Sequence, residues 1–337
     1  MTLCMNSCMD LRTHSRLSRR AALTGLAAAL AMPSIAKAQS WPSRPVLMIV
    51  PFPAGGPTDT LARTLANEFS NKLGQQFVVE NHGGAGGNIG AAMVARATPD
   101  GYTILFGTPG PVATNKLMYK DLSFDPEKDF APIALVAKSP LIIVAHPSTP
   151  AKDIGELAAY AKTHPGKLNV GYPGNGTLGH VTAVLLQNIL GISMTGVPYR
   201  GTAPLTTDLL GGQVDLGMDF MSTYVPLVKD GKLRAIAVTS VRRVTDLPDV
   251  MTVQEAGIKD FEATAWYALV APTGVPADVV QKINRATNDF LGSDKGKQTL
   301  DTFDMLPAGG TPADLRAYIG SELTKWGPVV KAANITL

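Results

Sequence analysis

The chain has 337 residues, of which 45% are apolar and 17% are charged, below the usual quarter. This composition predicts a compact globule and excludes a disordered chain, which would be polar and highly charged. The formal net charge is +3, but the excess of basic residues lies in the first 38 residues.

The N-terminal segment has the pattern of a signal peptide. Four arginines before residue 21 precede an apolar stretch of 12 residues, and Ala36-Lys37-Ala38 supplies a small-x-small cleavage site. The stretch is shorter than the roughly 20 residues that a membrane helix needs. We therefore predict a signal peptide over residues 1–38 and an exported chain that begins at Gln39. Because Arg19-Arg20 also fits a twin-arginine signal, the export route, Sec or Tat, stays open.

Removal of this segment changes the charge and the cysteine content. The segment holds five of the 30 basic and one of the 27 acidic residues, which leaves 25 and 26 and a net charge of about −1. A surface for nucleic acid or anionic lipid is therefore not expected. Cys4 and Cys8 also leave, so the mature chain is expected to have no disulfide, thiolate metal site or lipid-bearing cysteine, and no membrane anchor.

Strands and helices alternate in the first part of the mature chain. The pattern predicts strands at 46–50, 77–80 and 102–106 and helices at 58–73 and 88–96. Such an alternation is typical of a parallel sheet.

An interruption in the alternation of strands and helices then predicts a second lobe. Two apolar runs, 133–137 and 141–145, follow each other almost directly and fit a crossing between lobes, and residues 263–270 fit a second crossing. Between the crossings the predicted elements are helix 153–163, strand 168–172, helix 177–190, strand 195–199, helix 204–210, strand 214–219 and strand 233–238. Two further helices, 276–291 and 312–332, would pack back on the first lobe.

The predicted fold class is therefore α/β with two lobes. Lobe 1 is expected to comprise residues 39–138 and 265–337, and lobe 2 residues 139–264. Each lobe is a mostly parallel sheet flanked by helices, with a ligand cleft between the two.

Each predicted lobe contains one glycine-rich junction where a strand ends and a helix begins. The first reads PFPAGGPTDTLAR at 51–63, and the second reads NVGYPGNGTLGH at 169–180. A helix start offers unpaired N–H groups and a partial positive charge, so it binds anions without lysine or arginine. Pro57 suits the first helical position and Thr177 suits a cap. Either junction can also be only a tight turn; two of them, one per lobe, favour an anion site.

Several residues near the junctions have two interpretations. Asp59 either caps its own helix or accepts a hydrogen bond from a ligand, and His180 either orients its loop or touches the ligand. A side chain at Gly176 is predicted to block the approach of a ligand.

Catalytic and cofactor motifs are scarce in the sequence. No G-x-S-x-G, P-loop or H-E-x-x-H motif occurs, and the four histidines of the mature chain lack metal-ligand spacing. Residues 174–179 do match G-x-G-x-x-G, and Arg200 follows the next predicted strand, so an exported NADP-dependent oxidoreductase remains an alternative. The main interpretation is a protein that binds without catalysis and needs no cofactor or metal.

The sequence resembles a known receptor family over nearly all of the mature chain. The marks of this resemblance are WPSRP at 41–45, PFPAGGPTDTLAR, the glycines of 81–90, PDGY at 99–102, DFAPI at 129–133, YPGNGTLGH, VPYRG at 197–201 and residues 209–219. Together they are similar to the substrate-binding receptors of the tripartite tricarboxylate transporter family, called Bug receptors.

The resemblance implies a periplasmic, type II-like binding-protein fold that closes on a small carboxylate. It further implies delivery of the carboxylate to membrane permease subunits by a monomeric receptor that binds it through backbone N–H groups and water. Family members often differ at Tyr172, Pro173, Thr177 and Arg200, which leaves the ligand open among organic, amino and aromatic acids. A role as ligand sensor for a two-component system also stays open.

The candidate ligand-binding residues combine the junctions with positions just past predicted strands. Thr108 and Asp219 are expected at the cleft edge, where Asp219 could accept a hydrogen bond from a hydroxyl or amino group. Tyr199 either forms a wall of the pocket or belongs to the core. The full candidate set is Phe52, Ala54, Gly55, Gly56, Thr58, Asp59, Thr108, Tyr172, Gly174, Asn175, Gly176, Thr177, His180, Tyr199 and Asp219.

Overall fold

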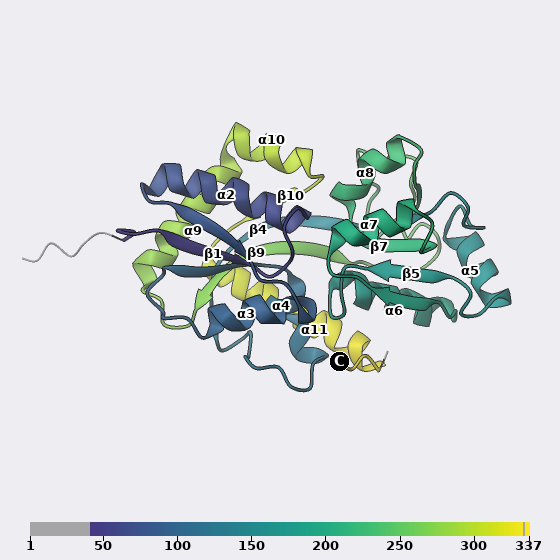
Figure 1. Cartoon of the computed structure of the whole chain (residues 1–337), viewed down its shortest axis with the longest axis horizontal. Helices are drawn as coiled ribbons and strands as arrows, with labels where there is room; N and C mark the ends of the chain where they lie inside the picture. The colour runs from purple at the N-terminus through teal and green to yellow at the C-terminus, as the bar shows by residue number, and fades with distance from the viewer. Residues whose placement is uncertain (1–40, 260, 333) are drawn as a thin grey trace, which may run out of the picture. The chain divides into compact units, whose positions relative to one another are not determined.

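A mixed ten-stranded β-sheet forms the centre of the computed structural model, which describes residues 41–259, 261–332 and 334–337 (Figure 1). The predicted signal peptide lies outside the described residues, and residues Pro42–Leu337 form one compact unit. The strands are β1 (Val46–Val50), β2 (Phe77–Asn81), β3 (Thr103–Gly107), β4 (Phe130–Ala145), β5 (Asn169–Tyr172), β6 (Thr195–Pro198), β7 (Leu216–Phe220), β8 (Arg234–Val238), β9 (Thr264–Pro272) and β10 (Leu306–Gly309). The order is β2-β1-β3-β9-β4-β7-β5-β6, and β8 and β10 also pair with β4.

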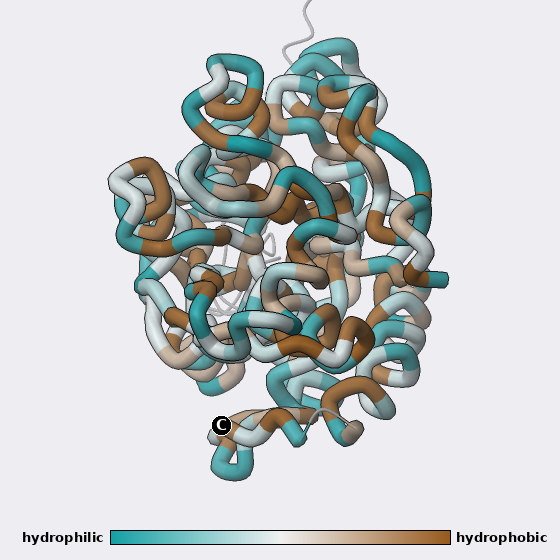
Figure 2. The backbone as a smooth tube through the Cα atoms, turned by 90° about the vertical axis from the view of Figure 1, so that its right-hand side faces the viewer, coloured by the Kyte–Doolittle hydropathy of each residue, from teal (hydrophilic) through white to brown (hydrophobic). Residues whose placement is uncertain are grey.

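Helices cover the sheet on both faces (Figure 1). They are α2 (Pro57–Leu73), α3 (Asn88–Ala95), α4 (Pro109–Val112), α5 (Ile154–Thr163), α6 (Leu178–Leu190), α7 (Thr202–Leu210), α8 (Met221–Lys229), α9 (Ala277–Gly292), α10 (Asp294–Thr302) and α11 (Pro312–Ala332), with short 3-10 turns at Ala85–Gly87 and Thr114–Leu117. Figure 2 shows hydrophobic segments gathered on the inside and hydrophilic ones on many outer turns. No helix of the described chain combines the length and apolar character that crossing a bilayer requires.

The α/β fold class is confirmed, with an antiparallel centre that the sequence pattern did not predict. Strands β1, β2 and β3 run parallel, and so do β5, β6 and β7. Between these two groups, β9 and β4 run antiparallel to each other, β9 runs antiparallel to β3, and β4 runs antiparallel to β7.

Strand β4 joins the two parallel groups. The two apolar runs at 133–137 and 141–145 both belong to this single strand of 16 residues. Up to Pro140 it pairs with β9, and from Leu141 onward it pairs with β7 and β8. The polar break at 138–140 therefore marks a change of partner. The division into lobes at this point and at residue 264 stays a prediction.

The strand directions bring the carboxyl ends of the two parallel groups together. Gly107, the last residue of β3, pairs with Ala268, which in turn pairs with Leu135 of β4. Phe220, the last residue of β7, pairs with Leu141. Both groups therefore end near the middle of β4, and the loops that follow their strands meet there.

Most predicted elements are present within a few residues of their expected ends, and the exceptions have local causes. Helix α8 was not predicted because Pro226 interrupts its pattern. Helix α10 follows α9 directly, after the capping residue Ser293, so the two lack a separating loop. Helix α7 begins at Thr202, two residues before the predicted start at Pro204.

The C-terminal helix α11 contacts both parts of the core. Leu315 and Ile319 pack in the cluster around β1, β3 and β9, and Trp326 packs in the cluster around β5 and α6. Its buried Glu322 accepts hydrogen bonds from the indole N–H groups of Trp266, at 3.1 Å, and Trp326, at 3.3 Å. One carboxylate thus satisfies two fully buried donors.

We expect Glu322→Leu to lower the free energy of unfolding by about 2–5 kcal/mol, because two buried N–H groups lose their acceptor. Glu322→Gln keeps an oxygen at the same place and should cost about 1 kcal/mol. Urea unfolding followed by tryptophan fluorescence measures both values. Equal stability of the leucine variant and the wild type would contradict the proposed role of the carboxylate.

Candidate functional site

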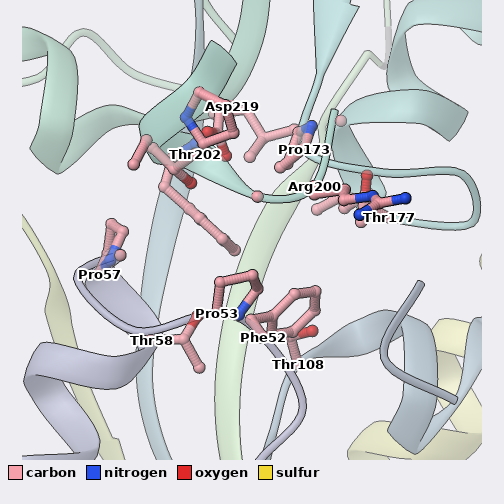
Figure 3. Close-up of a pocket in the computed structure, with 18 of the residues that line it drawn as sticks. Phe52, Pro53, Pro57, Thr58, Thr108, Pro173, Thr177, Arg200, Thr202 and Asp219 are labelled. Carbon is pink, nitrogen blue, oxygen red and sulfur yellow. Dashed lines mark hydrogen bonds between the residues drawn. The ribbon is translucent and has the colours of Figure 1, made fainter. Parts of the chain in front are cut away.

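An enclosed cavity lies where the carboxyl ends of the two strand groups meet (Figure 3). Its free volume is about 40 Å³. The lining residues follow β1, β3, β5 and β6, with two residues from the end of β7 and one from β4: Phe52, Pro53, Ala54, Gly56, Pro57, Thr58, Thr108, Pro109, Leu141, Pro173, Thr177, Leu178, Gly179, Arg200, Gly201, Thr202, Ala203, Pro204, Asp219 and Phe220. In Figure 3 Phe52, Thr58 and Thr108 face Thr202 and Asp219 across the cavity.

Three helices present their N-termini to this cavity. Lining residues occupy the first turn of α2 (Pro57 and Thr58), of α6 (Leu178 and Gly179) and of α7 (Thr202 to Pro204). The first N–H groups of a helix lack an intrahelical acceptor, and the helix dipole adds partial positive charge at the same end. The cavity is therefore suited to an anion.

The start of α2 agrees with the sequence prediction and is fixed by a buried carboxylate. Pro57 is the first helical residue, after Gly56 in extended conformation. Asp59 accepts hydrogen bonds from the Gly55 backbone N–H at 3.0 Å, from Arg63 Nε at 3.1 Å and from Asn81 Nδ2 at 2.9 Å. Of the two interpretations of Asp59, the geometry favours the one in which it holds its own loop.

These contacts also set the ionisation of Asp59. Burial opposes the charged form, but hydrogen bonds from Arg63, Gly55 and Asn81 together outweigh it and lower the pKa of Asp59.

The start of α6 is fixed in a similar way by a neutral imidazole. The Thr177 hydroxyl caps the helix, as predicted, by accepting from the His180 N–H. His180 Nδ1 accepts from the Gly176 N–H at 3.2 Å, and its ring packs on Tyr172 with centroids 4.6 Å apart. Burial lowers the pKa of His180 to about 4, so the ring stays neutral near pH 7 and can accept this bond. The geometry favours the interpretation in which His180 orients the loop.

The glycine loop at 174–176 contacts Gly86 and Tyr119 beside the cavity. The Tyr119 hydroxyl donates to the Asn175 carbonyl at 3.0 Å, and a Cβ at Gly86 would lie 2.3 Å from that same oxygen. Gly176 has φ +81°, and a Cβ there would meet the Tyr119 ring at 2.7 Å. The missing side chain of Gly176 therefore makes room for Tyr119, and Gly176 does not line the cavity. That a side chain at this position blocks a ligand stays a prediction.

A wider groove of about 740 Å³ adjoins the cavity and shares several lining residues with it, Phe52, Pro53 and Arg200 among them. Gly174, Asn175 and Tyr199 line this groove. The Tyr199 hydroxyl donates a hydrogen bond to Asp208 at 2.9 Å, and this bond fixes the position of the Tyr199 side chain.

Two ionisable residues, Arg200 and Asp219, are among those that line the cavity. The Arg200 residue is exposed, whereas Asp219 is 1% exposed. Burial raises the pKa of Asp219 to about 7, despite a hydrogen bond from the Phe220 N–H and the nearby hydroxyls of Thr202 and Tyr224. Among the described residues, no cluster of three or more His, Cys, Asp or Glu side chains could hold a metal ion.

The candidate residues of the sequence fall into three groups. Those that line the cavity are Phe52, Ala54, Gly56, Thr58, Thr108, Thr177 and Asp219. Those that line the outer groove and not the cavity are Gly174, Asn175 and Tyr199. Those in neither lining are Gly55, Asp59, Tyr172, Gly176 and His180. Contact of any of them with a ligand stays a prediction.

The sequence predicted the third helix within two residues of its start but did not place that start at the cavity. The segment from Arg200 to Pro204 lines the cavity, but its pattern suggested only a strand end and a helix from Pro204. Gly201, with φ +107°, was the available signal, because glycine before a Thr-x-Pro sequence is typical of a helix start.

Comparison with known proteins identifies the family. A family model described as tripartite tricarboxylate transporter family receptor matches residues 61–335. This chain belongs to that receptor family. The protein BugT of Bordetella pertussis is 34% identical over 89% of this chain and 92% of its own length.

Solved structures of related receptors share the fold. Rpa4515 of R. palustris with adipate has a TM-score of 0.85 and 38% identity, with coverage of 88% of this chain and 99% of that one. MatC of Rhodopseudomonas palustris with bound malate has a TM-score of 0.82 and 36% identity, with coverage of 86% and 100%. The predicted resemblance to Bug receptors and the periplasmic binding-protein fold are confirmed.

The contact between the loops predicts a large difference between two glycine variants. Gly86→Ala and Gly166→Ala both place alanine at positive φ, at +63° and +72°, but a Cβ at Gly166 has no neighbour within 4 Å. We expect Gly166→Ala to cost about 1–2 kcal/mol from backbone strain. Gly86→Ala should cost about 1–3 kcal/mol more, because it pushes against Asn175. Thermal unfolding of both variants measures this, and equal losses would mean that the loops separate freely.

The lowered pKa of Asp59 predicts a pH-dependent contribution to stability. A carboxyl with a folded pKa below its unfolded value of about 3.9 stabilises the fold above that pH, and loses the contribution as pH falls through the folded pKa. The difference in urea midpoint between wild type and Asp59→Asn should therefore be constant from pH 7 to 5 and shrink below about pH 4. A difference independent of pH down to pH 2 would refute this assignment.

Proposed function

We propose that this chain is a periplasmic receptor that closes on a small carboxylate and delivers it to the membrane permease subunits of a tripartite transporter, without catalysing a reaction. The observation that carries the proposal is the convergence of three helix N-termini on one small enclosed cavity. The family assignment supports it.

The cavity suits binding by backbone groups. A carboxylate placed against the starts of α2, α6 and α7 would accept hydrogen bonds from N–H groups that have no intrahelical partner. Such bonds to a charged acceptor are shorter and stronger than neutral ones, and their value rises where water is excluded. Arg200, exposed at the cavity wall, would add a positive charge at the entrance.

The same arrangement would couple binding to closure. Gly86, after β2, and Tyr119, after β3, belong to one strand group, and both contact the Asn175 loop, which follows β5 of the other group. A ligand that contacts both groups adds binding energy only when the loops meet, so it would favour the closed state. Membrane subunits can recognise the loaded receptor only if its closed conformation differs from that of the empty receptor. We place the hinge at the crossings of β4 and β9, and we propose that the receptor acts as a monomer.

Related receptors support a carboxylate as the ligand. The structures of Rpa4515 and MatC contain adipate and malate, and both match this chain over more than four fifths of its length. The cavity described above lies at the equivalent kind of position, outside the carboxyl ends of the strands, where ligands of α/β proteins bind.

The alternative of an NADP-dependent oxidoreductase has less support. A dinucleotide would need the glycine loop at 174–179 to lie open to its pyrophosphate. Instead the Gly176 N–H is bound to His180, and Tyr119 covers the loop through its hydrogen bond to Asn175. A sensor for a two-component system would use the same cavity and differ only in its partner, so loss of solute uptake on deletion of the chain would favour transport.

A thermal-shift screen tests the carboxylate proposal. The panel holds succinate, malate, aspartate, adipate, citrate and benzoate, with 1,4-butanediol and adipamide as uncharged matches. At 100 times its Kd an acid should stabilise the fold by about 2.7 kcal/mol, and a chain of this size should then melt several degrees higher. Failure of every acid to shift the melting temperature would overturn the proposal.

Proline variants test whether backbone N–H groups carry the binding. Ala203→Pro removes an N–H from the first turn of α7, where proline is tolerated. Its control, Ala277→Pro, makes the same change in the first turn of α9, away from the cavity. We expect the first variant to weaken the best acid about tenfold and the control to bind like wild type. Equal affinities would show that α7 does not contribute.

A further inference from the structure

The buried carboxyl group of Asp219 is unusual among the groups around the cavity. It lies in β7, next to the last residue of the strand, lines the cavity and is 1% exposed. Its Oδ1 accepts a hydrogen bond from the Phe220 N–H at 2.7 Å, whereas Oδ2 has no hydrogen-bond partner among the described residues. A buried carboxylate oxygen without a partner costs free energy, so its retention in a binding cavity points to a partner that the ligand provides.

The surroundings of Asp219 are neutral. The side chains that interact with it are those of Thr202, Tyr224 and Tyr267, from α7, α8 and β9, and each carries a neutral hydroxyl. Burial and the nearby Asp219 raise the pKa of both tyrosines well above the usual value, so they remain neutral. The Tyr267 hydroxyl also has no hydrogen-bond partner among the described residues. The remaining ionisable group of the cavity lining, Arg200, is exposed at its wall.

We propose that Asp219 determines specificity by accepting a hydrogen bond from an amino or hydroxyl group of the ligand, so that this receptor prefers amino- or hydroxy-substituted acids to plain dicarboxylates. The inference rests on the proposed function, because it assumes that the ligand's carboxylate occupies the helix N-termini. It adds a second contact on the opposite side of the same cavity, where Figure 3 shows Asp219 beside Thr202 and across from Thr58.

The charge of Asp219 favours a hydrogen-bond donor of the ligand over a second ligand carboxylate at Oδ2. Two like charges in contact repel each other more strongly in a partly buried site than in water, because the effective dielectric is lower there. An ammonium or hydroxyl group at Oδ2 instead satisfies the unpaired oxygen and stabilises the charged form of Asp219. A site built to hydrogen-bond a ligand group rejects an analogue that lacks this group far better than an apolar pocket does.

A ligand donor at Asp219 Oδ2 and a ligand carboxylate at the same place would change the protonation of Asp219 in opposite directions. Near pH 7 part of the free receptor carries a proton on Asp219. A ligand donor at Oδ2 favours the ionised form, so binding should release protons. A ligand carboxylate at Oδ2 would favour the protonated form, so binding would take protons up.

Isothermal titration calorimetry with matched ligands tests the inference. One set comprises succinate, malate and aspartate, and the other comprises adipate, 2-hydroxyadipate and 2-aminoadipate. In whichever of the two sets binds, we expect the hydroxy or amino acid to bind at least tenfold more tightly than the plain diacid of the same chain length. Titrations at pH 7 in buffers of different ionisation enthalpy should show net proton release, and the stronger of the two substituted acids identifies the donor.

Two variants test whether Asp219 causes the ligand preference and the proton release. Asp219→Asn keeps the size of the side chain and should reduce the preference to about threefold or less and abolish proton release. Asp230→Asn, an exposed carboxylate after α8, should leave both unchanged.

Each further outcome separates the inference from the proposed function. A plain diacid that binds as tightly as its substituted partner, proton uptake in the wild type, or an unchanged preference in Asp219→Asn would overturn the inference while leaving a carboxylate receptor in place. Absence of binding by all six acids in the wild type would overturn the inference, and failure of citrate and benzoate as well would overturn the proposed function. Because the first two readouts use the wild type, misfolding of a variant cannot decide the question.

Discussion

The antiparallel pairing of β4 with β9 is the constraint on which the rest of the structure depends. The pairing extends from Phe130 with Pro272 to Pro140 with Thr264, and β4 then continues into the second strand group. Because β3 and β7 run in opposite directions along this central strand, their carboxyl ends face each other near its middle. Loops separated by more than 100 residues in the sequence, at Phe52 and Pro173, therefore line one cavity.

The cavity is positively polarised mainly by backbone groups, and its supporting side chains lie behind the loops. Asp59 and His180 hold the starts of α2 and α6 from positions outside the cavity lining. One is ionised and the other is neutral, yet both use the same device, a side-chain acceptor that takes the N–H group of a glycine one turn earlier in the chain. Pre-organised N–H groups lose little entropy when an anion arrives, which favours tight binding of a small ligand.

A cavity of this kind recognises the charge of an acid but not the rest of the molecule. Recognition of the remainder requires a further group in the cavity, and Asp219 is proposed for this role because its free oxygen is buried beside neutral hydroxyls. In the proposed receptor, helix N-termini bind the carboxylate of the ligand, and the buried side chain of Asp219 selects the amino or hydroxyl substituent. The contacts between the Gly86 and Asn175 loops would then exclude water from both interactions.

The sequence by itself determined the local structure and the family. Periodic apolar residues placed most helices and strands, Pro57 and Thr177 marked two helix starts correctly, and the glycine junctions indicated an anion site. These features depend on residues within one turn of each other, so their pattern is visible along the chain. Tertiary structure alone decided that 133–145 forms one strand, that α7 supplies a third helix start, and that Asp59, Gly176 and His180 lie outside the cavity lining while Asp219 lies within it. Those properties depend on which distant residues become neighbours, since burial and the direction of a side chain are set by packing between segments.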